Sequence, residues 1–538
     1  MPRLALGILA LLPLAACRGP CGTPCPDACP APSSAARTDP TAAADADALE
    51  AALTSLDATP QTRERAIDLG RTLWEAGRLR AALETLGKRF LAGRPALAKR
   101  VDDSDRVTAF VGAQLWIEGR NPRHPSAAQP SWEALARSHA AMLAASAVPR
   151  SERSLENPAF VAELEALGGA PFTDGNSVEV LVDGPASWAV REPLVASARR
   201  ELLVASWAIY DDGTGRRAVD AFLARAGAGV DVRVVVDGQT ESLPAYAGQV
   251  ERLATGAAGL APRLAVTRWL DAARPFDGMH QKLLIVDADS LVTGGMNWGD
   301  AYSHADPASP KHWRDTDVLV RGPAVAQARA LFARRYGAPL AAASVAVPVA
   351  VPRNGATERV ALLEHVPGDD DPILRTLLKA LDGARTSIDV ENAYVVRIPS
   401  VEAGLLDAVR RGVRVRVLTN SATSCDEPII AGAILRSVGA LADGGVEVYL
   451  RRGTTLHGKF ATVDGVFAQV GSYNLHPRSH RLEHEVVVDV LGRRTAERLE
   501  ETFEADLREA DRIRSSADVA VPDDPLGRIA WLLCPDLL

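Results

Sequence analysis

The stretch His280-Gln281-Lys282-Leu283-Leu284-Ile285-Val286-Asp287, with Gly294, Gly295 and Asn297 after it, occurs a second time in this chain. The second copy is His457-Gly458-Lys459-Phe460-Ala461-Thr462-Val463-Asp464, and Gly471, Ser472 and Asn474 follow it at the same intervals. Both copies fit the pattern H-x-K-x4-D-x6-G-[GS]-x-N. Because chance rarely places six constrained positions twice in one protein, the repeat predicts a duplicated fold with half of one site in each copy.

Each motif combines side chains that can act on a phosphate group. Alternation after Lys282 and after Lys459 predicts a mostly buried strand, and a period of two puts each lysine on the same face as its histidine. One neutral imidazole can attack phosphorus, while a second, protonated imidazole gives its proton to the departing oxygen. The two ammonium groups and the amides of Asn297 and Asn474 would hold the non-bridging oxygens, and Ser472 adds a hydroxyl donor. This design requires no metal and no other cofactor.

The spacing resembles the signature of the phospholipase D superfamily, which is also called the HKD family. The resemblance implies two α/β/α sandwich domains that are related by a pseudo-twofold axis and share one site. It also implies a covalent phosphohistidine intermediate, with His280 as the nucleophile and His457 as the general acid. The sequence itself does not rank the two histidines.

The same resemblance implies a carboxylate, downstream of each motif, that hydrogen-bonds a histidine and fixes its tautomer. Glu485 is the matching residue in the second copy. Asp315 is the best match in the first copy, with Asp317 as a possible substitute. We expect Asp287 and Asp464, which complete the motifs, to bond backbone or neighbouring side chains rather than substrate.

Strands alternate with helices in both halves of the chain. The first half predicts a helix over 193–200 and strands over 202–210 and 230–237, and the second half predicts a helix over 373–381 and strands over 387–394 and 413–420. The interval from Gly229 to Asp237 equals that from Gly412 to Asn420. The pattern predicts an α/β fold in which each half is a sheet covered on both faces.

A length of 538 residues predicts about three domains. We expect a signal peptide at 1–16, a flexible tether at 17–46, a helical N-terminal domain at 47–175, and phospholipase D-like domains at 176–344 and 356–538. A proline-rich linker that ends in Asn354-Gly355 separates the last two.

The N-terminus predicts an exported, lipid-anchored protein. Arg3 precedes an apolar run from Leu4 to Ala16, which is too short to span a bilayer and has the length of a signal-peptide core. The run ends in Leu14-Ala15-Ala16-Cys17, which resembles a bacterial lipobox, so Cys17 is the predicted lipidation site. The protein would then be held at a membrane of the bacterial cell envelope, periplasmic or outer. An ordinary secretory signal is the alternative.

Local segments favour a phospholipid as substrate. Trp313-Arg314-Asp315-Thr316 and the Asn474-x3-Arg478-Ser479 extension resemble segments of bacterial cardiolipin synthases, and Arg478 is a candidate contact to a second phosphate or to the acceptor lipid. Lys and Arg number 60 against 68 Asp and Glu, and a net charge of −8 disfavours nucleic acid. A nuclease with a basic groove near Arg451 and Arg452, and a non-catalytic envelope protein that binds phosphorylated ligands, are the alternatives. The sequence defines no oligomeric state.

Overall fold

The computed structural model describes residues 40–54, scattered positions between 65 and 89, and residues 129–240, 244–271, 274, 277–337 and 357–522. The expected signal peptide, Cys17 and the linker at 345–355 lie outside the described residues. Helix α2 (Pro40–Thr54) begins inside the expected tether, because its alanine-rich sequence has a high helix propensity. In the described part of the chain, no helix has the length and apolar character needed to cross a membrane.

The two halves repeat one strand order. From the middle of the molecule outward, the first half contains β1 (Thr173–Val182), β8 (Thr316–Arg321), β7 (Ser290–Gly294), β6 (Leu283–Val286), β2 (Glu201–Ser206), β3 (Asp231–Asp237) and β4 (Leu264–Trp269). The second half contains β9 (Glu358–His365), β15 (Glu483–Leu491), β14 (Phe467–Gly471), β13 (Lys459–Val463), β10 (Ser387–Asn392), β11 (Arg414–Asn420) and β12 (Glu447–Arg451), with β16 (Ala510–Ile513) added at its edge. The predicted duplication is confirmed.

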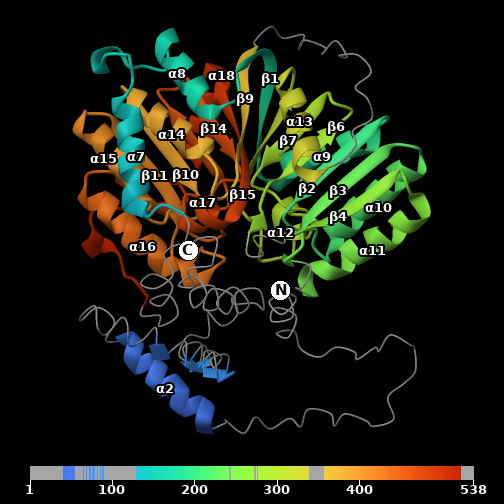
Figure 1. The fold of residues 1–538 in the computed structure, drawn as a ribbon, viewed down its shortest axis with the longest axis horizontal. Coiled ribbons are helices and arrows are strands. Elements are labelled where there is room, and N and C mark those ends of the chain that lie inside the picture. Colours follow the sequence, from blue (N-terminus) through green and yellow to red (C-terminus); the bar gives the residue numbers. More distant parts are fainter. Residues whose placement is uncertain are drawn as a thin grey trace.

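The sheets of the two halves are joined. Strands β1 and β9 pair in antiparallel fashion through Thr173 opposite Val360 and Asn176 opposite Glu358. The described strands therefore form one 16-stranded sheet, with β1 and β9 in the middle of the view and the halves spreading to either side (Figure 1). Each half was expected to have a sheet of its own. The join is physically favourable because it satisfies the backbone groups of two strands that would otherwise be edges.

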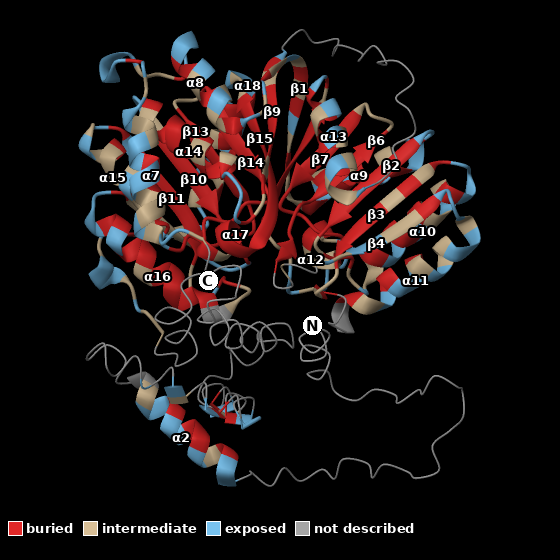
Figure 2. Cartoon of the chain, in the orientation of Figure 1, coloured by how far each residue is buried: buried red, intermediate tan, exposed pale blue. Residues whose placement is uncertain are grey.

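Helices cover both faces of each half. The outer layers are α9 (Asp183–Ser197), α10 (Gly213–Gly227) and α11 (Pro244–Leu260) in the first half, and α14 (Pro372–Gly383), α15 (Pro399–Arg410) and α16 (Pro428–Asp443) in the second. Helices α13 (Ala324–Tyr336) and α18 (Arg493–Leu507) lie on the other face and cross between halves, since α13 contacts β9 and α18 contacts β1. Phe332 and Phe503 of these helices share one core with strand residues from both halves. Figure 2 shows the central strands largely buried, the edge strand β4 partly exposed, and most exposed residues on the outer helix surfaces.

The first outer helix differs from its predicted position. Helix α9 spans 183–197 and contains Pro193, whereas the sequence predicted a helix over 193–200. Proline often opens a helix, and this preference misplaced the predicted start. Trp188 and Val195 of α9 both enter the hydrophobic core of the first half, and this burial maintains the helix despite the proline.

The last two α-helices before strand β1 belong to the outer layer of the second half. Helix α7 (Trp132–Ala144) begins where Ser131 accepts a hydrogen bond from the Ala134 amide, and α8 (Pro158–Gly168) ends at Gly169 with a φ of 63°. Both helices contact α14, and Phe160 of α8 is fully buried in the second half's core. Strand β1 starts at Thr173, so it spans the expected domain boundary at 175 and 176.

Candidate active site

The two H-x-K motifs lie at the start of equivalent central strands. His280 and Lys282 precede β6 directly, and Lys459 is the first residue of β13, two residues after His457. All four side chains are buried. The strands therefore hold two imidazoles and two amines inside the protein, where each charge requires a nearby partner.

The aspartates of the motifs secure the turns that follow these strands. Asp287, in a left-handed conformation with φ of 53°, accepts hydrogen bonds from the backbone amides of Arg199, Arg200 and Glu201. Asp464, with φ of 54°, does the same for residues 385–387. Both carboxylates thus bond backbone, which is the role the sequence indicated for them, and they fasten each hairpin to the strand beside it.

The halves meet through short strand pairings at the motifs. Strand β5 (Gly278–Met279) runs parallel to the start of β15, and the His280 amide donates to the carbonyl of His484 at 3.0 Å. On the opposite side, Leu456 forms a parallel bridge with Arg314, and the His457 amide donates to the Arg314 carbonyl at 2.6 Å. The histidine of each half is therefore placed beside the acid-bearing segment of the other half.

As a result, the histidine–carboxylate pairs cross between the halves. Nδ1 of His280 lies 3.0 Å from both carboxylate oxygens of Glu485, and Nδ1 of His457 lies 2.7 Å from Oδ2 of Asp315. The acid downstream of one motif serves the histidine of the other motif, an exchange that the sequence did not reveal. Asp317, the possible substitute for Asp315, is instead bonded to Arg191 at 2.7 Å.

Two serines hold Glu485 in place. The Ser472 hydroxyl donates to Oε2 of Glu485 and accepts from the Val486 amide at 2.9 Å, so it orients the acid. Oγ of Ser479, on helix α17 (Pro477–Leu482), lies 2.5 Å from Oε1 of the same carboxylate. In the first copy Gly295 occupies the place of Ser472, because a Cβ there would lie 2.2 Å from the Asp315 carboxylate.

The two motif asparagines differ in their surroundings. The Asn297 amide nitrogen donates to the Tyr302 hydroxyl at 2.9 Å, and its oxygen accepts from the Ser206 hydroxyl at 3.2 Å. The Asn474 side-chain oxygen is buried and has no hydrogen-bond partner among the described residues. Asn297 therefore stabilises the loop that carries it, whereas the side-chain oxygen of Asn474 is left without a partner among the described residues.

Charges from both motifs act on one another, which places them in one site. Burial lowers the pKa of His280, and Lys282, Lys459 and His457 lower it further. Burial also lowers the pKa of Lys282 to about 7, with Lys459 adding to the effect. Clustered cations in a buried site are mutually destabilising until an anion neutralises them. The site is therefore electrostatically suited to a phosphate group.

The pKa values of the two acids that pair with the histidines shift in the opposite direction. Burial raises the pKa of Asp315 to about 6, and burial followed by the charge of Glu483 raises that of Glu485 well above its usual range. Each histidine and its acid lie within hydrogen-bond distance, so each pair titrates as a unit.

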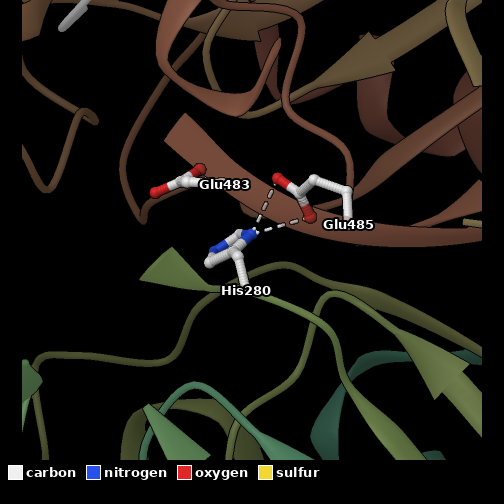
Figure 3. Close-up of side chains that lie close together, drawn as sticks. All are labelled: His280, Glu483 and Glu485. Atoms are coloured by element: carbon white, nitrogen blue, oxygen red, sulfur yellow. Dashed lines mark hydrogen bonds and ion pairs between the residues drawn. The ribbon is translucent and has the colours of Figure 1, made fainter. Parts of the chain in front are cut away.

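Glu483 is a site residue that the sequence did not single out. Ligand atoms of His280, Glu483 and Glu485 all lie within 4.8 Å of one another, and Figure 3 shows both carboxylates close to the ring of His280. Such a donor set could hold a metal ion. In the structure, however, Glu483 is paired with Arg478 at 2.9 Å and Glu485 with His280, so both acids are already engaged. Its position two residues before Glu485 is the feature by which the sequence could have identified Glu483 as a site residue.

Two further residues support the histidines from equivalent strand ends. Oδ2 of Asp237 accepts from the Met279 amide at 2.7 Å, and Oδ1 of Asn420 accepts from the Leu456 amide at 2.9 Å. Met279 and Leu456 immediately precede the two histidines, so both bonds fix the backbone that carries an imidazole. The equal intervals that end at Asp237 and Asn420 in the sequence could have identified these residues.

The arginines that were considered for a basic groove are paired with acids. Arg451 lies 3.2 Å from Asp506, and Arg452 lies 2.8 Å from Asp511. Their charges are therefore compensated within the protein, which weakens the case for nucleic acid at this position.

Two fused α/β/α halves that meet around crossed histidine–carboxylate pairs define the phospholipase D type of fold and site. The family model described as "Cardiolipin synthase, PLD-like domain" matches residues 193–334 and 377–507. Cardiolipin synthase A of Pseudomonas entomophila (strain L48) is 30% identical over 393 residues, which cover 72% of this chain and 80% of the relative. Cardiolipin synthase A of Pseudomonas aeruginosa (strain LESB58) is 31% identical over 344 residues, or 63% and 69% of the two chains.

The fold agrees with these relatives. The crystal structure of a phosphatidylserine synthase from Haemophilus influenzae Rd KW20 superposes with a TM-score of 0.58 at 14% identity, covering 70% of this chain and 98% of that one. The chain belongs to the phospholipase D superfamily, among its cardiolipin synthase-like members. It is accordingly a phospholipase D-family enzyme.

Proposed function

We propose that this enzyme transfers a phosphatidyl group from one phospholipid to an alcohol through a covalent phosphohistidine. The observation that carries the proposal is the crossed pairing of the histidines. Nδ1 of each histidine is hydrogen-bonded to a buried carboxylate of the other half, and Nε2 takes no part in that bond. The names of the relatives, cardiolipin synthase A, support a phospholipid donor.

The residues divide the reaction between two steps. One imidazole attacks phosphorus, and the other gives a proton to the alcohol that leaves. The second imidazole then takes a proton from an incoming alcohol, which displaces the first imidazole. Lys282 and Lys459 would stabilise the negative charge on the non-bridging oxygens as phosphorus becomes five-coordinate. Phosphatidylglycerol as acceptor gives cardiolipin, and water gives phosphatidic acid.

We propose further that the protein works at a membrane of the cell envelope. Lipid chains attached to Cys17 would anchor it there. The lipobox-like Leu14-Ala15-Ala16-Cys17 supports this anchoring. A tethered enzyme would meet its substrate in the plane of the bilayer, where lipids are concentrated.

The proposed activity is tested by incubating the protein with phosphatidylglycerol vesicles and isotope-labelled glycerol, with products identified by mass. Cardiolipin or labelled phosphatidylglycerol indicates transfer, and phosphatidic acid indicates hydrolysis. Unreacted lipid, with the protein shown to be folded, contradicts the proposal. A parallel sample with plasmid DNA detects nuclease activity. Asp511→Asn, which alters only an exposed ion pair, is the matched control for variants of the site acids.

A further inference from the structure

Helix α17 holds the two carboxylates that lie beside His280. Oγ of Ser479 lies 2.5 Å from Oε1 of Glu485 and 2.9 Å from Oε2 of Glu483. Arg478, the preceding residue of the helix, pairs with Glu483 at 2.9 Å. These bonds fix the acid that is hydrogen-bonded to His280. A displacement of α17 would therefore displace the partner of one of the two imidazoles.

Helix α17 is too short to keep this position by itself. It has six residues, and its first turn is closed by the Ser479 amide, which donates to Nδ1 of His476 at 3.1 Å. Isolated helices shorter than about 12 residues are marginal in water, because few backbone bonds offset the cost of nucleation. The position of α17 must therefore come from the contacts that its residues make with the rest of the protein.

Arg481 of α17 is held by an N-terminal clasp that consists of Gln129, Pro130 and Trp132. Nη1 of Arg481 donates to Oε1 of Gln129 at 3.0 Å, and Nη2 donates to the Pro130 carbonyl at 2.8 Å. Nε2 of Gln129 in turn donates to the Arg481 carbonyl at 3.0 Å. The guanidinium also lies 4.2 Å from the centre of the Trp132 ring. The clasp therefore binds both the side chain and the backbone of α17 at this buried residue.

Helix α7 attaches the clasp firmly to the second half. Nε2 of His139, on α7, lies 2.7 Å from Oδ2 of Asp371, and both side chains are buried. The helix also contacts α14 and α15. At its start, the Trp132 ring lies 5.4 Å from the ring of His480 on α17, and His480 stacks on His365 of β9 with centroids 5.0 Å apart. The clasp is therefore part of a packed layer that can hold α17 in one place.

The first half holds its equivalent helix in a different way. Helix α12 (Asp300–Ser303) begins three residues after Asn297, and α17 begins at the same interval after the asparagine of the second motif. Helix α12 contacts α9 and α10 of its own half, and Ser303 shares a 2.6 Å hydrogen bond with Thr214 of α10. The matched family model begins at residue 193, so the clasp lies outside it. The clasp is therefore an addition to the duplicated fold.

We propose that Gln129 and Trp132 are positioning residues for the reaction, because they hold Arg481 and with it the helix that fixes Glu485. The inference rests on the proposed phosphatidyl transfer, in which this acid orients His280. Reaction rates depend steeply on the placement of the reacting groups, and a displacement of about 1 Å can cost about 100-fold. The N-terminal region thus contributes to turnover as well as to packing.

Trp132→Ala in the full-length protein tests this role. The kcat for phosphatidyl transfer should fall about 10- to 100-fold, whereas KM should change little, because Lys282 and Lys459 are not on α17. Trp132→Phe keeps a ring beside the guanidinium and should retain most of the turnover. Gln129→Ala removes two hydrogen bonds at a half-buried position and should act in the same direction if Trp132→Ala does not fold. Wild-type kcat in the Ala variants contradicts the proposal.

Arg153→Ala is the matched control. Arg153 joins the same N-terminal region to the second half, since its guanidinium donates to Asp382 of α14 at 2.9 Å and to the Val148 carbonyl at 3.1 Å. Its loss should lower stability but leave kcat per folded molecule unchanged. If Arg153→Ala lowers kcat as much as Trp132→Ala does, the effect belongs to the packing of the whole region, and the specific role of the clasp is contradicted.

Hydrogen exchange measures the clasp without any substrate. The amides of residues 477–482 should exchange faster in Gln129→Ala and Trp132→Ala than in the wild type or in Arg153→Ala. Unchanged exchange shows that the clasp does not hold α17, and faster exchange with unchanged kcat shows that its hold does not matter to the reaction. Either result overturns the inference. Wild-type protein that leaves phospholipid unreacted instead contradicts the proposed transfer, and the exchange rates still decide whether the clasp holds α17.

Discussion

Crossed pairing makes each acid a partner of the opposite histidine. Asp315→Asn should therefore impair His457, because an amide that donates to Nδ1 forces the proton onto the other ring nitrogen. We expect a fall in turnover of roughly 10²- to 10⁴-fold, the range seen when an orienting carboxylate is lost from a catalytic histidine. Steady-state phosphatidyl transfer measures the effect.

Asp511→Asn is the control for this variant, since Asp511 pairs with the exposed Arg452. Binding of inorganic phosphate by Asp315→Asn should be nearly unchanged, because Lys282 and Lys459 remain. Turnover equal to that of the control would show that the pair is not part of the reaction.

Lys282 connects phosphate binding with pH. Its pKa is lowered to about 7 by burial, so it is charged below that pH and neutral above it. Affinity for inorganic sulfate, a phosphate analogue whose own charge does not change in this range, should therefore fall as pH rises through about 7, as calorimetric titration can measure. Lys282→Arg keeps its charge in this range and should weaken the dependence. A wild-type affinity that is constant across neutral pH would contradict the lowered pKa.

At the scale of the elements, the motif hairpins depend on their aspartates for stability rather than chemistry. Asp464→Ala leaves the amides of residues 385–387 without their acceptor. At about 1 kcal/mol for each hydrogen bond, the free energy of unfolding should fall by about 2 to 3 kcal/mol. Urea unfolding measures this loss, while turnover per folded molecule should be unchanged.

Asp289→Ala is the matched control in the equivalent hairpin of the first half. Among the hydrogen bonds of the described residues, the Asp289 carboxylate accepts only one, from the neighbouring Ser290 hydroxyl at 3.2 Å. A large drop in turnover for Asp464→Ala in the fully folded protein would instead place this aspartate in the reaction.

The sequence predicted the repeated strands well, but it did not predict that the acid of each half pairs with the histidine of the other half. Periodicity located the motif strands to within about a residue, since buried alternation is a local property. His280 pairs with Glu485 of the opposite half, and Ser472 orients that acid. This arrangement depends on how the two halves pack, and no local sequence pattern encodes it. Pro193 misled the prediction of α9 because core burial outweighed a local preference.

At the scale of the whole molecule, the halves form one folding unit. Strands β1 and β9 pair across the middle, α13 and α18 each contact the opposite half, and a single hydrophobic core draws on both halves. A separated half would expose this core and lose the acid that its histidine needs. The duplication is therefore visible in the sequence, whereas the dependence of each half on the other is visible only in three dimensions.

This unity predicts that the covalent connection between the halves is dispensable once the protein has folded. A site-specific protease sequence placed within 345–355, the predicted linker, would allow the chain to be cut after folding. The two fragments should co-elute from a size-exclusion column at the volume of the uncut protein, with unchanged turnover, because the joined sheet and shared core hold them together. After urea denaturation, recovery of activity should depend on concentration in the cut protein alone, since reassembly becomes bimolecular. Fragments that separate without denaturant, or a single fragment that keeps activity, would contradict the shared core and the crossed pairs respectively.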